Sequence, residues 1–380
     1  MLFSFSEVFC LDFSYNGALT QTYLQTTGNQ SDKDSTTFPN TDEGSWKFTE
    51  MLLGGSFEIN EKLRIGAQAI SRVYGNYGNY DLSLDWGYAD YRHNEYIGLR
   101  LGKVKYALGI YNESRDVDSA RTSILLSQGI YDEGNRSFVT ATNGASIYGS
   151  FEKDKFGVLD YQFTLGNIDI PKDFVMNEFL GINGLWDSGR FEGKWLAGMH
   201  LEYSAPWGSK LDGLKLGFSH SEFRADAGIT TDAPIPNVPA NYDFTYDIST
   251  TIFSVEYTQY KYTLGGEFMF RQLGPDVPDN VISNYQAVNI TAWDILLDEL
   301  TRDQRAYYLF GAYQVTEKYS AQLMWSSIDH RNRSESDSDI YTLSHRYDWT
   351  ENIVTKAEYH HMYDEDGQWG LFLARIGYTF

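Results

Sequence analysis

One short segment of the chain combines charges of both signs with an aromatic hydroxyl. Its candidate functional residues are Tyr111, Glu113, Arg115, Asp116, Asp118 and Arg121. In a narrow passage with low-dielectric walls, such charges would act on a passing ion far more strongly than they do in bulk water. Opposite charges facing each other there would also order water and disfavour apolar solutes. The alternative is that these charges pair with each other and fix the segment to its surroundings.

The sequence lacks the motifs of the common hydrolytic enzymes and metal sites. It contains 7 histidines, but neither a Gly-x-Ser-x-Gly nor a His-Glu-x-x-His motif occurs. The neighbours His360 and His361 cannot serve one site, because adjacent residues of a strand point to opposite faces. The acidic segments 32–34, 335–339 and 364–367 lack EF-hand spacing. We therefore expect no enzyme, no metal and no cofactor, and we interpret the acidic segments as solvated loops.

Composition indicates that apolar and polar residues are interleaved along the whole chain. Hydrophobic residues make up 42% of the 380 positions, yet the mean hydropathy is −0.42. No run approaches the ~18 consecutive apolar residues that a spanning helix needs. This excludes a helical membrane protein. It does not exclude a membrane β-barrel, whose strands alternate lipid-facing and lumen-facing residues.

Charge and the N-terminal segment restrict the possible partners and the extent of the domain. The formal net charge of −22 argues against nucleic acid as a partner, because a phosphate backbone attracts a basic surface. The single cysteine, Cys10, excludes an intrachain disulfide. Residues 1–11 are largely apolar but have no basic region and no small-x-small cleavage site. We interpret them as an N-terminal segment that could be the remnant of a signal, and we assign residues 12–380 to one domain.

A period of two in hydrophobicity recurs along this domain and predicts β-strands. Apolar residues alternate with polar or small ones over residues 63–69, 195–205, 214–219 and 262–271. Each of these strands would have one apolar and one polar face. Aromatic side chains are expected where such strands cross a lipid interface. The candidates for this girdle are Trp86, Trp195, Tyr203, Trp325, Trp349 and Tyr378.

The connections between the predicted strands alternate between short and long. Short connections lie near residues 60–62, 93–94, 154–155, 208–210, 260–261, 316–318 and 351–352. Long connections lie near residues 28–44, 75–82, 110–142, 168–190, 226–243, 272–304, 330–338 and 364–368. Together they predict an all-β, transmembrane antiparallel β-barrel of about sixteen strands, with short periplasmic turns and long extracellular loops. A soluble β-sandwich or propeller is the alternative, but the chain has no repeated blade signature.

The C-terminus has the pattern of a terminal barrel strand. Phe380, Tyr378 and Ile376 alternate with polar or small residues, so they would share one face. This end resembles the terminal strand that bacterial outer-membrane proteins present to their assembly machinery. A strand with a free edge can pair with another sheet. We therefore interpret these three residues as an assembly signal.

The stretch from Gly98 to Tyr131 resembles a known family. A strand with Gly and Lys runs into Gly109-Ile-Tyr-Asn-Glu-Ser-Arg-Asp116 and then into a long loop with paired charges. This is similar to the phosphate-selective porin superfamily, the O and P type porins of Gram-negative outer membranes. The resemblance implies a sixteen-stranded, usually trimeric barrel whose third loop, here residues 110–142, folds inward and narrows the pore. The six candidate residues would then lie at the constriction.

The alternation also predicts which basic residues line the pore wall. These are Arg64, Arg72, Arg100, Lys194, Lys215, Arg271, Arg346 and Arg375. The same faces contain the acidic residues Glu152, Glu202, Glu267, Asp348 and Glu358. Such a mixture does not form the basic ladder that a phosphate-selective pore needs, so phosphate specificity is not inferred.

These features favour an outer-membrane porin for passive diffusion of small hydrophilic solutes or ions. The expected partners are outer-membrane lipid, lipopolysaccharide and two further copies of the chain in a homotrimer. The alternative is a structural barrel that docks a surface partner or anchors an envelope assembly through loops 168–190 and 272–304. Residues 292–301 have helical spacing and would form a short amphipathic helix in the second of these loops. A barrel around an electron-transfer protein is a third option, but the chain has no haem-attachment motif.

Overall fold

A computed structural model describes most of the chain, and nearly all of its regular structure is β-strand. The described residues are 12–28, 41–75, 78–134, 136–168, 188–230, 241–276, 302–330, 337–364 and 367–380. The N-terminal segment 1–11 and residues 292–301 lie outside them. Two short helices, η1 (Asp118–Ala120) and α1 (Arg136–Val139), follow β5. Within the described ranges, no helix is long and apolar enough to cross a membrane.

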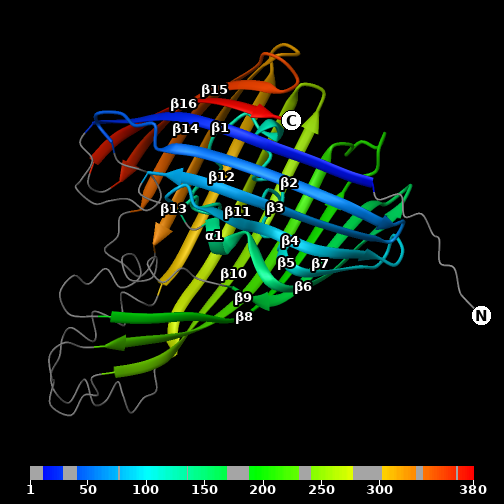
Figure 1. Cartoon of the computed structure of the whole chain (residues 1–380). Helices are drawn as coiled ribbons and strands as arrows, with labels where there is room; N and C mark the ends of the chain where they lie inside the picture. Colours follow the sequence, from blue (N-terminus) through cyan, green and yellow to red (C-terminus); the bar gives the residue numbers. More distant parts are fainter. Residues whose placement is uncertain are drawn as a thin grey trace, which may run out of the picture.

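Sixteen antiparallel strands form one closed barrel (Figure 1). The first eight are β1 (Asp12–Gly28), β2 (Phe48–Asn60), β3 (Leu63–Tyr74), β4 (Leu82–Arg92), β5 (Gly98–Lys105), β6 (Ala141–Lys153), β7 (Gly157–Asn167) and β8 (Ser188–Ser204). The others are β9 (Leu214–Thr230), β10 (Asn241–Gln259), β11 (Tyr262–Asp276), β12 (Arg302–Gln314), β13 (Tyr319–His330), β14 (Ser338–Asp348), β15 (Ile353–Asp364) and β16 (Gly367–Thr379). The predicted number and direction of the strands are confirmed.

The first and last strands pair with each other and close the barrel. Their register runs from Ala18 opposite Thr379 to Gly28 opposite Trp369. Gly17 and Phe380 exchange two backbone hydrogen bonds, of 2.9 and 3.0 Å. Closure removes the free strand edges, which a lipid environment would leave without hydrogen-bond partners.

The strand bounds agree with most of the predicted connections and correct two of them. For example, residues 61–62 separate β2 from β3, residues 260–261 separate β10 from β11, and residues 106–140 separate β5 from β6. The predicted long connection at 364–368 is wrong. Only residues 365–366 separate β15 from β16. The predicted short connection near 208–210 is longer than expected, because residues 205–213 separate β8 from β9.

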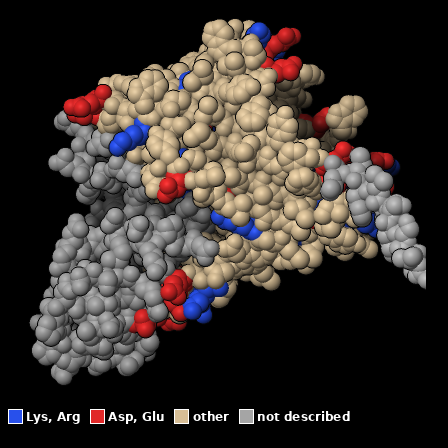
Figure 2. Space-filling model, viewed as in Figure 1, with Lys and Arg blue, Asp and Glu red and all other residues tan. Residues whose placement is uncertain are grey.

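The outer wall is apolar, as alternation predicts for a barrel solvated by lipid. Its exposed side chains include Leu53, Phe57, Ile65, Phe163, Leu165, Leu264, Leu309, Leu323 and Ile376. In the face of the wall seen in Figure 2, side chains without charge predominate. A wall of this composition is stable in contact with acyl chains and costly in contact with water. The fold is therefore a transmembrane β-barrel.

Five of the six girdle candidates are compatible with this wall, and one prediction is wrong. Trp195, Trp349 and Tyr378 are exposed on the outside. Trp86 instead faces the lumen, where the Lys105 ammonium lies 6.0 Å from its ring centroid. The reason is a register shift between β3 and β4 at Gln68 and Ala69, which inserts a residue and reverses the alternation.

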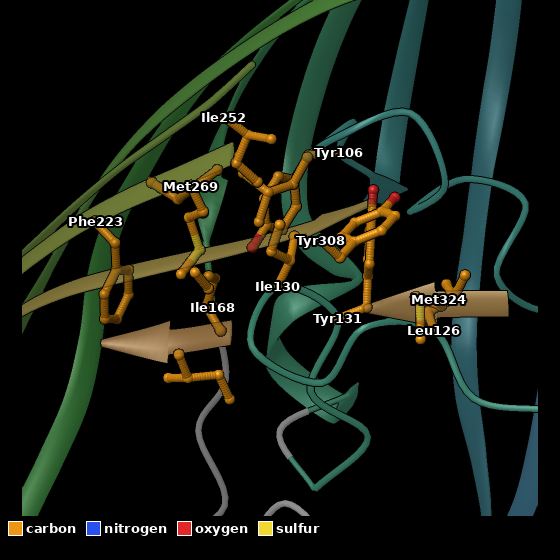
Figure 3. Packing of buried hydrophobic residues seen from close by; sticks show 14 of the residues in the cluster. Tyr106, Leu126, Ile130, Tyr131, Ile168, Phe223, Ile252, Met269, Tyr308 and Met324 are labelled. Atoms are coloured by element: carbon orange, nitrogen blue, oxygen red, sulfur yellow. The ribbon is translucent and has the colours of Figure 1, made fainter. Parts of the chain in front are cut away.

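The connection between β5 and β6, residues 106–140, turns into the barrel and is called the inner loop below (Figure 1). It begins slightly earlier than the predicted range 110–142. Its apolar side chains join those of the wall in two buried clusters. The first cluster contains Tyr106, Leu126, Ile130 and Tyr131 of the inner loop with Phe223, Ile252, Met269, Tyr308 and Ile328 of the wall, among others (Figure 3). The second contains Ile124 and Leu125 of the loop with Leu24, Phe48, Tyr74, Trp369 and Leu371, among others.

Candidate functional site

A buried glutamate of the wall binds the first part of the inner loop. Glu267 of β11 accepts hydrogen bonds from the Ile110 backbone amide at 2.9 Å, from Ser254 Oγ at 2.5 Å and from Tyr308 OH at 2.8 Å. The preceding residue, Gly109, has a φ of +67° and donates its amide to a wall serine. A Cβ at Gly109 would lie 2.7 Å from the Glu267 carboxylate. Glycine therefore allows the loop backbone to approach this carboxylate closely.

A second buried glutamate binds the loop on a different part of the wall. Glu358 of β15 accepts the backbone amides of Ile124 at 2.7 Å and Leu125 at 3.1 Å. Ser344 Oγ and His360 Nε2 also bind this carboxylate, each at 2.7 Å. The inner loop is thus held between carboxylates on β11 and β15.

The two adjacent histidines lie on opposite faces, as predicted. His360 is buried beside Glu358. The ring of His361 packs against Tyr359 and Tyr363, two side chains that are exposed on the outer wall. The described residues contain no cluster of three or more His, Cys, Asp or Glu suited to a metal ion.

Asp118, one of the predicted constriction residues, is paired with two cations of the wall. Its carboxylate lies 3.0 Å from both Lys356 Nζ and Arg375 Nη1. Lys356 also donates to the backbone carbonyls of Asp118 and Ser123, at 2.7 and 3.0 Å. Burial opposes ionisation of Asp118, but the two cations, with Arg121, outweigh it and hold the pKa of this carboxyl well below its usual range.

Asp116 is paired in the same manner with other cations. Its carboxylate contacts Lys105 of β5 and Arg136 of α1. Arg136 also lies 3.4 Å from Asp85 of β4. Burial again opposes the charge, while Arg136 and Lys105 lower the pKa of Asp116 below its usual range.

Arg115 lies inside the inner loop and does not face an open passage. It is 3% exposed, and its guanidinium binds Glu133 at 2.8 Å and the carbonyls of Tyr131 and Asp132. Glu133 in turn binds Arg72 of β3 at 3.0 Å. Burial disfavours the Glu133 carboxylate, but Arg115 and Arg72 keep its pKa low.

The remaining candidates differ in their exposure. Arg121 donates to the carbonyls of Arg115 at 2.5 Å and Ile124 at 3.1 Å. Tyr111 donates to the carboxylate of Glu256. Glu113 is the candidate with a largely accessible carboxylate, at 47% exposure, and it lies 3.5 Å from Arg100. The contacts of Arg115, Asp116 and Asp118 therefore fit the second sequence interpretation, in which the charges fix the segment.

Seven of the eight predicted wall cations contact lumen groups. Four of them bind groups of the inner loop. Arg72 binds Glu133, Arg100 binds Glu113, Arg346 binds two loop carbonyls, and Arg375 binds Asp118. Arg64 pairs with Asp90 at 3.8 Å, Lys215 pairs with Glu202 at 3.5 Å, and Arg271 donates to Thr250 and Gln304.

The predicted lumen position of Lys194 is wrong. A register shift between Gly193 and Trp195 places an extra residue in β8, so the alternation changes face there. The Lys194 ammonium lies 2.7 Å from Asp226. Asp226 directly follows Ala225, whose side chain is buried inside the barrel. Because adjacent residues of a strand point to opposite faces, Asp226 lies on the outer face.

Sequence reasoning missed several charged residues that hold the loop, among them Lys105, Lys356, Glu133 and Arg136. Lys356 lies two residues before Glu358, so the alternation that placed Glu358 in the lumen also applies to Lys356. Glu133 and Arg136 lie in the loop itself, where no period exists to indicate their direction. Their partners became evident only from the structure.

A cavity of about 590 Å³ lies between the inner loop and strands β2 to β8, at the barrel end where β2 joins β3. We call it the vestibule. Its lining includes Ala107, Gly109, Ile110 and Glu113 of the loop. Charged residues of the strands and turns around it are Glu58, Glu61, Lys62, Arg64, Asp90, Arg92, Glu95, Arg100, Asp160 and Glu202. An open space thus reaches the inner loop from this mouth of the barrel.

Comparison with known proteins supports the fold without assigning a family. No protein-family model matches the sequence, and no curated protein matches it. Among solved structures, an anion-selective porin from Comamonas acidovorans has a TM-score of 0.59 at 12% identity, covering 97% of this chain and 100% of that chain. OmpT, an outer membrane protein of Vibrio cholerae, has a TM-score of 0.57 at 13% identity and 97% coverage of both chains. The outer membrane channel DcaP of Acinetobacter baumannii has a TM-score of 0.55 at 9% identity, again with 97% coverage of both.

These likenesses define the class of the molecule as a β-barrel with the fold of Gram-negative outer-membrane porins. The narrower resemblance to phosphate-selective porins is not confirmed by them. The fold and the inner loop together describe a barrel whose lumen contains a charged loop attached to the wall.

Proposed function

We propose that this protein is an outer-membrane diffusion channel for small hydrophilic solutes or ions, and that the inner loop sets its narrowest point. The supporting observation is the attachment of one loop to distant parts of the wall, through Glu267 on β11, Glu358 on β15 and Lys105 on β5. A loop held in this way leaves little free cross-section. The channel should therefore pass small solutes slowly and exclude large ones.

The loop charges contribute to function mainly by fixing the loop, and only secondarily by direct contact with solute. In a low-dielectric neck, paired charges hold a rigid shape, whereas an accessible charge interacts with passing ions. Glu113 has that accessible position, at the border of the vestibule, beside its less exposed partner Arg100. Selectivity should respond most directly to these two side chains.

The outer wall offers a surface for the proposed homotrimer. Gly55, Ala67 and Gly87 are paired in register across β2, β3 and β4. These small residues lie in one row on the outer face, between the side chains of Phe13 and Leu84, so another barrel can approach closely at its centre. The remainder of the wall would contact outer-membrane lipid and lipopolysaccharide.

The second candidate function is a structural barrel that docks a partner or anchors an envelope assembly. The burial of much of the inner loop favours it, because a lumen filled by its own loop conducts poorly. The proposed docking loops 168–190 and 272–304 lie mostly outside the described residues.

Single-channel recording in a planar bilayer distinguishes the two functions. The purified protein is inserted under a salt gradient, so that both conductance and reversal potential are measured. Stable small steps are expected for a diffusion channel. A correctly folded barrel that remains silent would contradict the channel proposal and favour the structural role.

A further inference from the structure

The vestibule combines a basic and an acidic wall in one cavity of ligand size. Its volume of about 590 Å³ is typical of sites for small molecules. It is open to one mouth of the barrel and ends at the inner loop. A solute that enters from this mouth meets the vestibule before the constriction.

The basic wall consists of arginines on three consecutive strands. Arg64 of β3 lies opposite Asp90 of β4 in the sheet, and Asp90 lies opposite Arg100 of β5. Asp90 is shared, at 3.8 Å from Arg64 and 3.5 Å from Arg100, and it also accepts the Tyr148 hydroxyl. Arg92, two residues further along β4, has no carboxylate within ion-pair distance among the described residues. Arg100 also pairs with Glu113 at 3.5 Å, and Glu58 of β2 lies opposite Arg64. The Arg92 guanidinium is therefore the group of this wall that is available to a solute, and guanidinium groups bind carboxylates with two parallel hydrogen bonds.

The acidic wall contains an unfavourable pair of like charges. Asp160 of β7 and Glu202 of β8 lie directly opposite each other in the sheet, where like charges destabilise strand pairing. Glu202 has partial compensation from Lys215 at 3.5 Å and His200 at 3.9 Å. Asp160 has no cationic partner within the described part of the chain. Two carboxylates kept together at the edge of a cavity form a suitable site for an ammonium group.

We propose that the vestibule binds zwitterionic solutes of the amino-acid or short-peptide class. The solute carboxylate binds at Arg92, and its ammonium group binds at Asp160 and Glu202. This inference rests on the proposed channel function for its physiological meaning, but binding can be measured without conduction. It assigns the vestibule a substrate class that the mixed lumen charge alone does not define.

Three peptides that differ only in their terminal charges test the proposal. Triglycine has both charges, N-acetyl-triglycine has only the carboxylate, and triglycine amide has only the ammonium group. Each is titrated by calorimetry into the full-length protein in detergent micelles. Triglycine should bind about tenfold more tightly than either singly charged analogue, because each lost end removes a charge-assisted hydrogen bond.

Two variants assign the two walls. In the Asp160→Asn variant, the affinity for triglycine should fall to that of N-acetyl-triglycine. The affinity for N-acetyl-triglycine itself should not fall, because this peptide has no ammonium group. Arg92→Gln should reduce triglycine binding to the level of triglycine amide. Glu152→Gln is the matched control, because Glu152 is an acidic residue of β6 that does not line the vestibule. It should bind all three peptides as the unsubstituted protein does.

The results separate this inference from the channel function. The zwitterion site would be overturned, even if the barrel conducts, if the three peptides bind with equal affinity. It would also be overturned if Asp160→Asn and Arg92→Gln weaken the binding of all three peptides by the same factor. Discrimination among the peptides in a barrel that never conducts would support the site and contradict the channel proposal.

Discussion

At the residue scale, the central feature is the pairing of inner-loop carboxylates with wall cations. Asp118 is shared by Lys356 and Arg375, and Asp116 is shared by Lys105 and Arg136. Each carboxylate is surrounded by more cationic charge than it carries. Removing a carboxylate therefore leaves the lumen more positive.

The double substitution Asp116→Asn with Asp118→Asn should shift ion selectivity towards anions. The substituted side chains keep their size, while the ammonium and guanidinium groups around them lose their counter-charges. The reversal potential under a salt gradient measures the shift. Glu317→Gln combined with Glu351→Gln, in the exposed β12–β13 and β14–β15 turns, is the matched two-charge control. An unchanged reversal potential in the double variant would remove these residues from any role in selectivity.

The same pairs predict how the loop responds to pH. Asp116, Asp118 and Glu133 each have a pKa lowered in the folded protein. A carboxyl with a lowered pKa stabilises the folded state fully above its unfolded pKa, and this contribution is lost as pH falls towards the folded value. The contribution of these carboxylates to the attachment of the loop should thus weaken below about pH 4. Single-channel conductance over this range measures it. Conductance that is the same at pH 3 as at pH 6 would contradict the assigned pairs.

At the element scale, the inner loop depends on close backbone contact with the wall. A Cβ at Gly129 would lie 2.8 Å from the Cβ of Ala306 and 2.8 Å from Ile328. Gly129→Ala should therefore force the loop away from β12 and β13, at a cost of about 1–3 kcal/mol of unfolding free energy. Urea unfolding of the barrel in lipid vesicles measures the loss.

Gly198→Ala is the matched control for this substitution. Its added Cβ would meet no heavy atom closer than 3.9 Å, although the residue also faces the lumen. It should leave stability within about 0.5 kcal/mol. Equal losses in the two variants would indicate that the close packing of Gly129 has no particular importance.

The elements also mark where sequence reasoning succeeds and where it fails. Regular alternation predicted the strands and placed Arg375, Glu358 and Glu267 in the lumen correctly. It failed at Trp86 and Lys194, because each lies at or beside a register shift that a period of two cannot reveal. It also could not pair Asp118 with Lys356, since these residues meet only after the loop has crossed the lumen.

At the scale of the whole molecule, the row of small residues on the outer wall predicts the oligomer. Ala67→Trp places a large ring in the centre of the row formed by Gly55, Ala67 and Gly87. The variant should dissociate into folded monomers, because the barrels can no longer approach closely. Light scattering in detergent measures the mass. Leu323→Trp, on the outer face of β13, is the control, and it should leave the trimer intact. A trimer in both variants would place the interface elsewhere.

The central claim is that attachment of the inner loop to the wall limits passage through the barrel. The most direct test is to compare single-channel conductance of the unsubstituted protein with that of Glu267→Gln combined with Glu358→Gln. These substitutions remove both carboxylates that hold loop amides, while the strand register is unchanged. Sedimentation and unfolding confirm beforehand that the variant barrel is folded. The account predicts a severalfold larger or strongly fluctuating conductance in the variant. Identical, steady conductance in both proteins would contradict it.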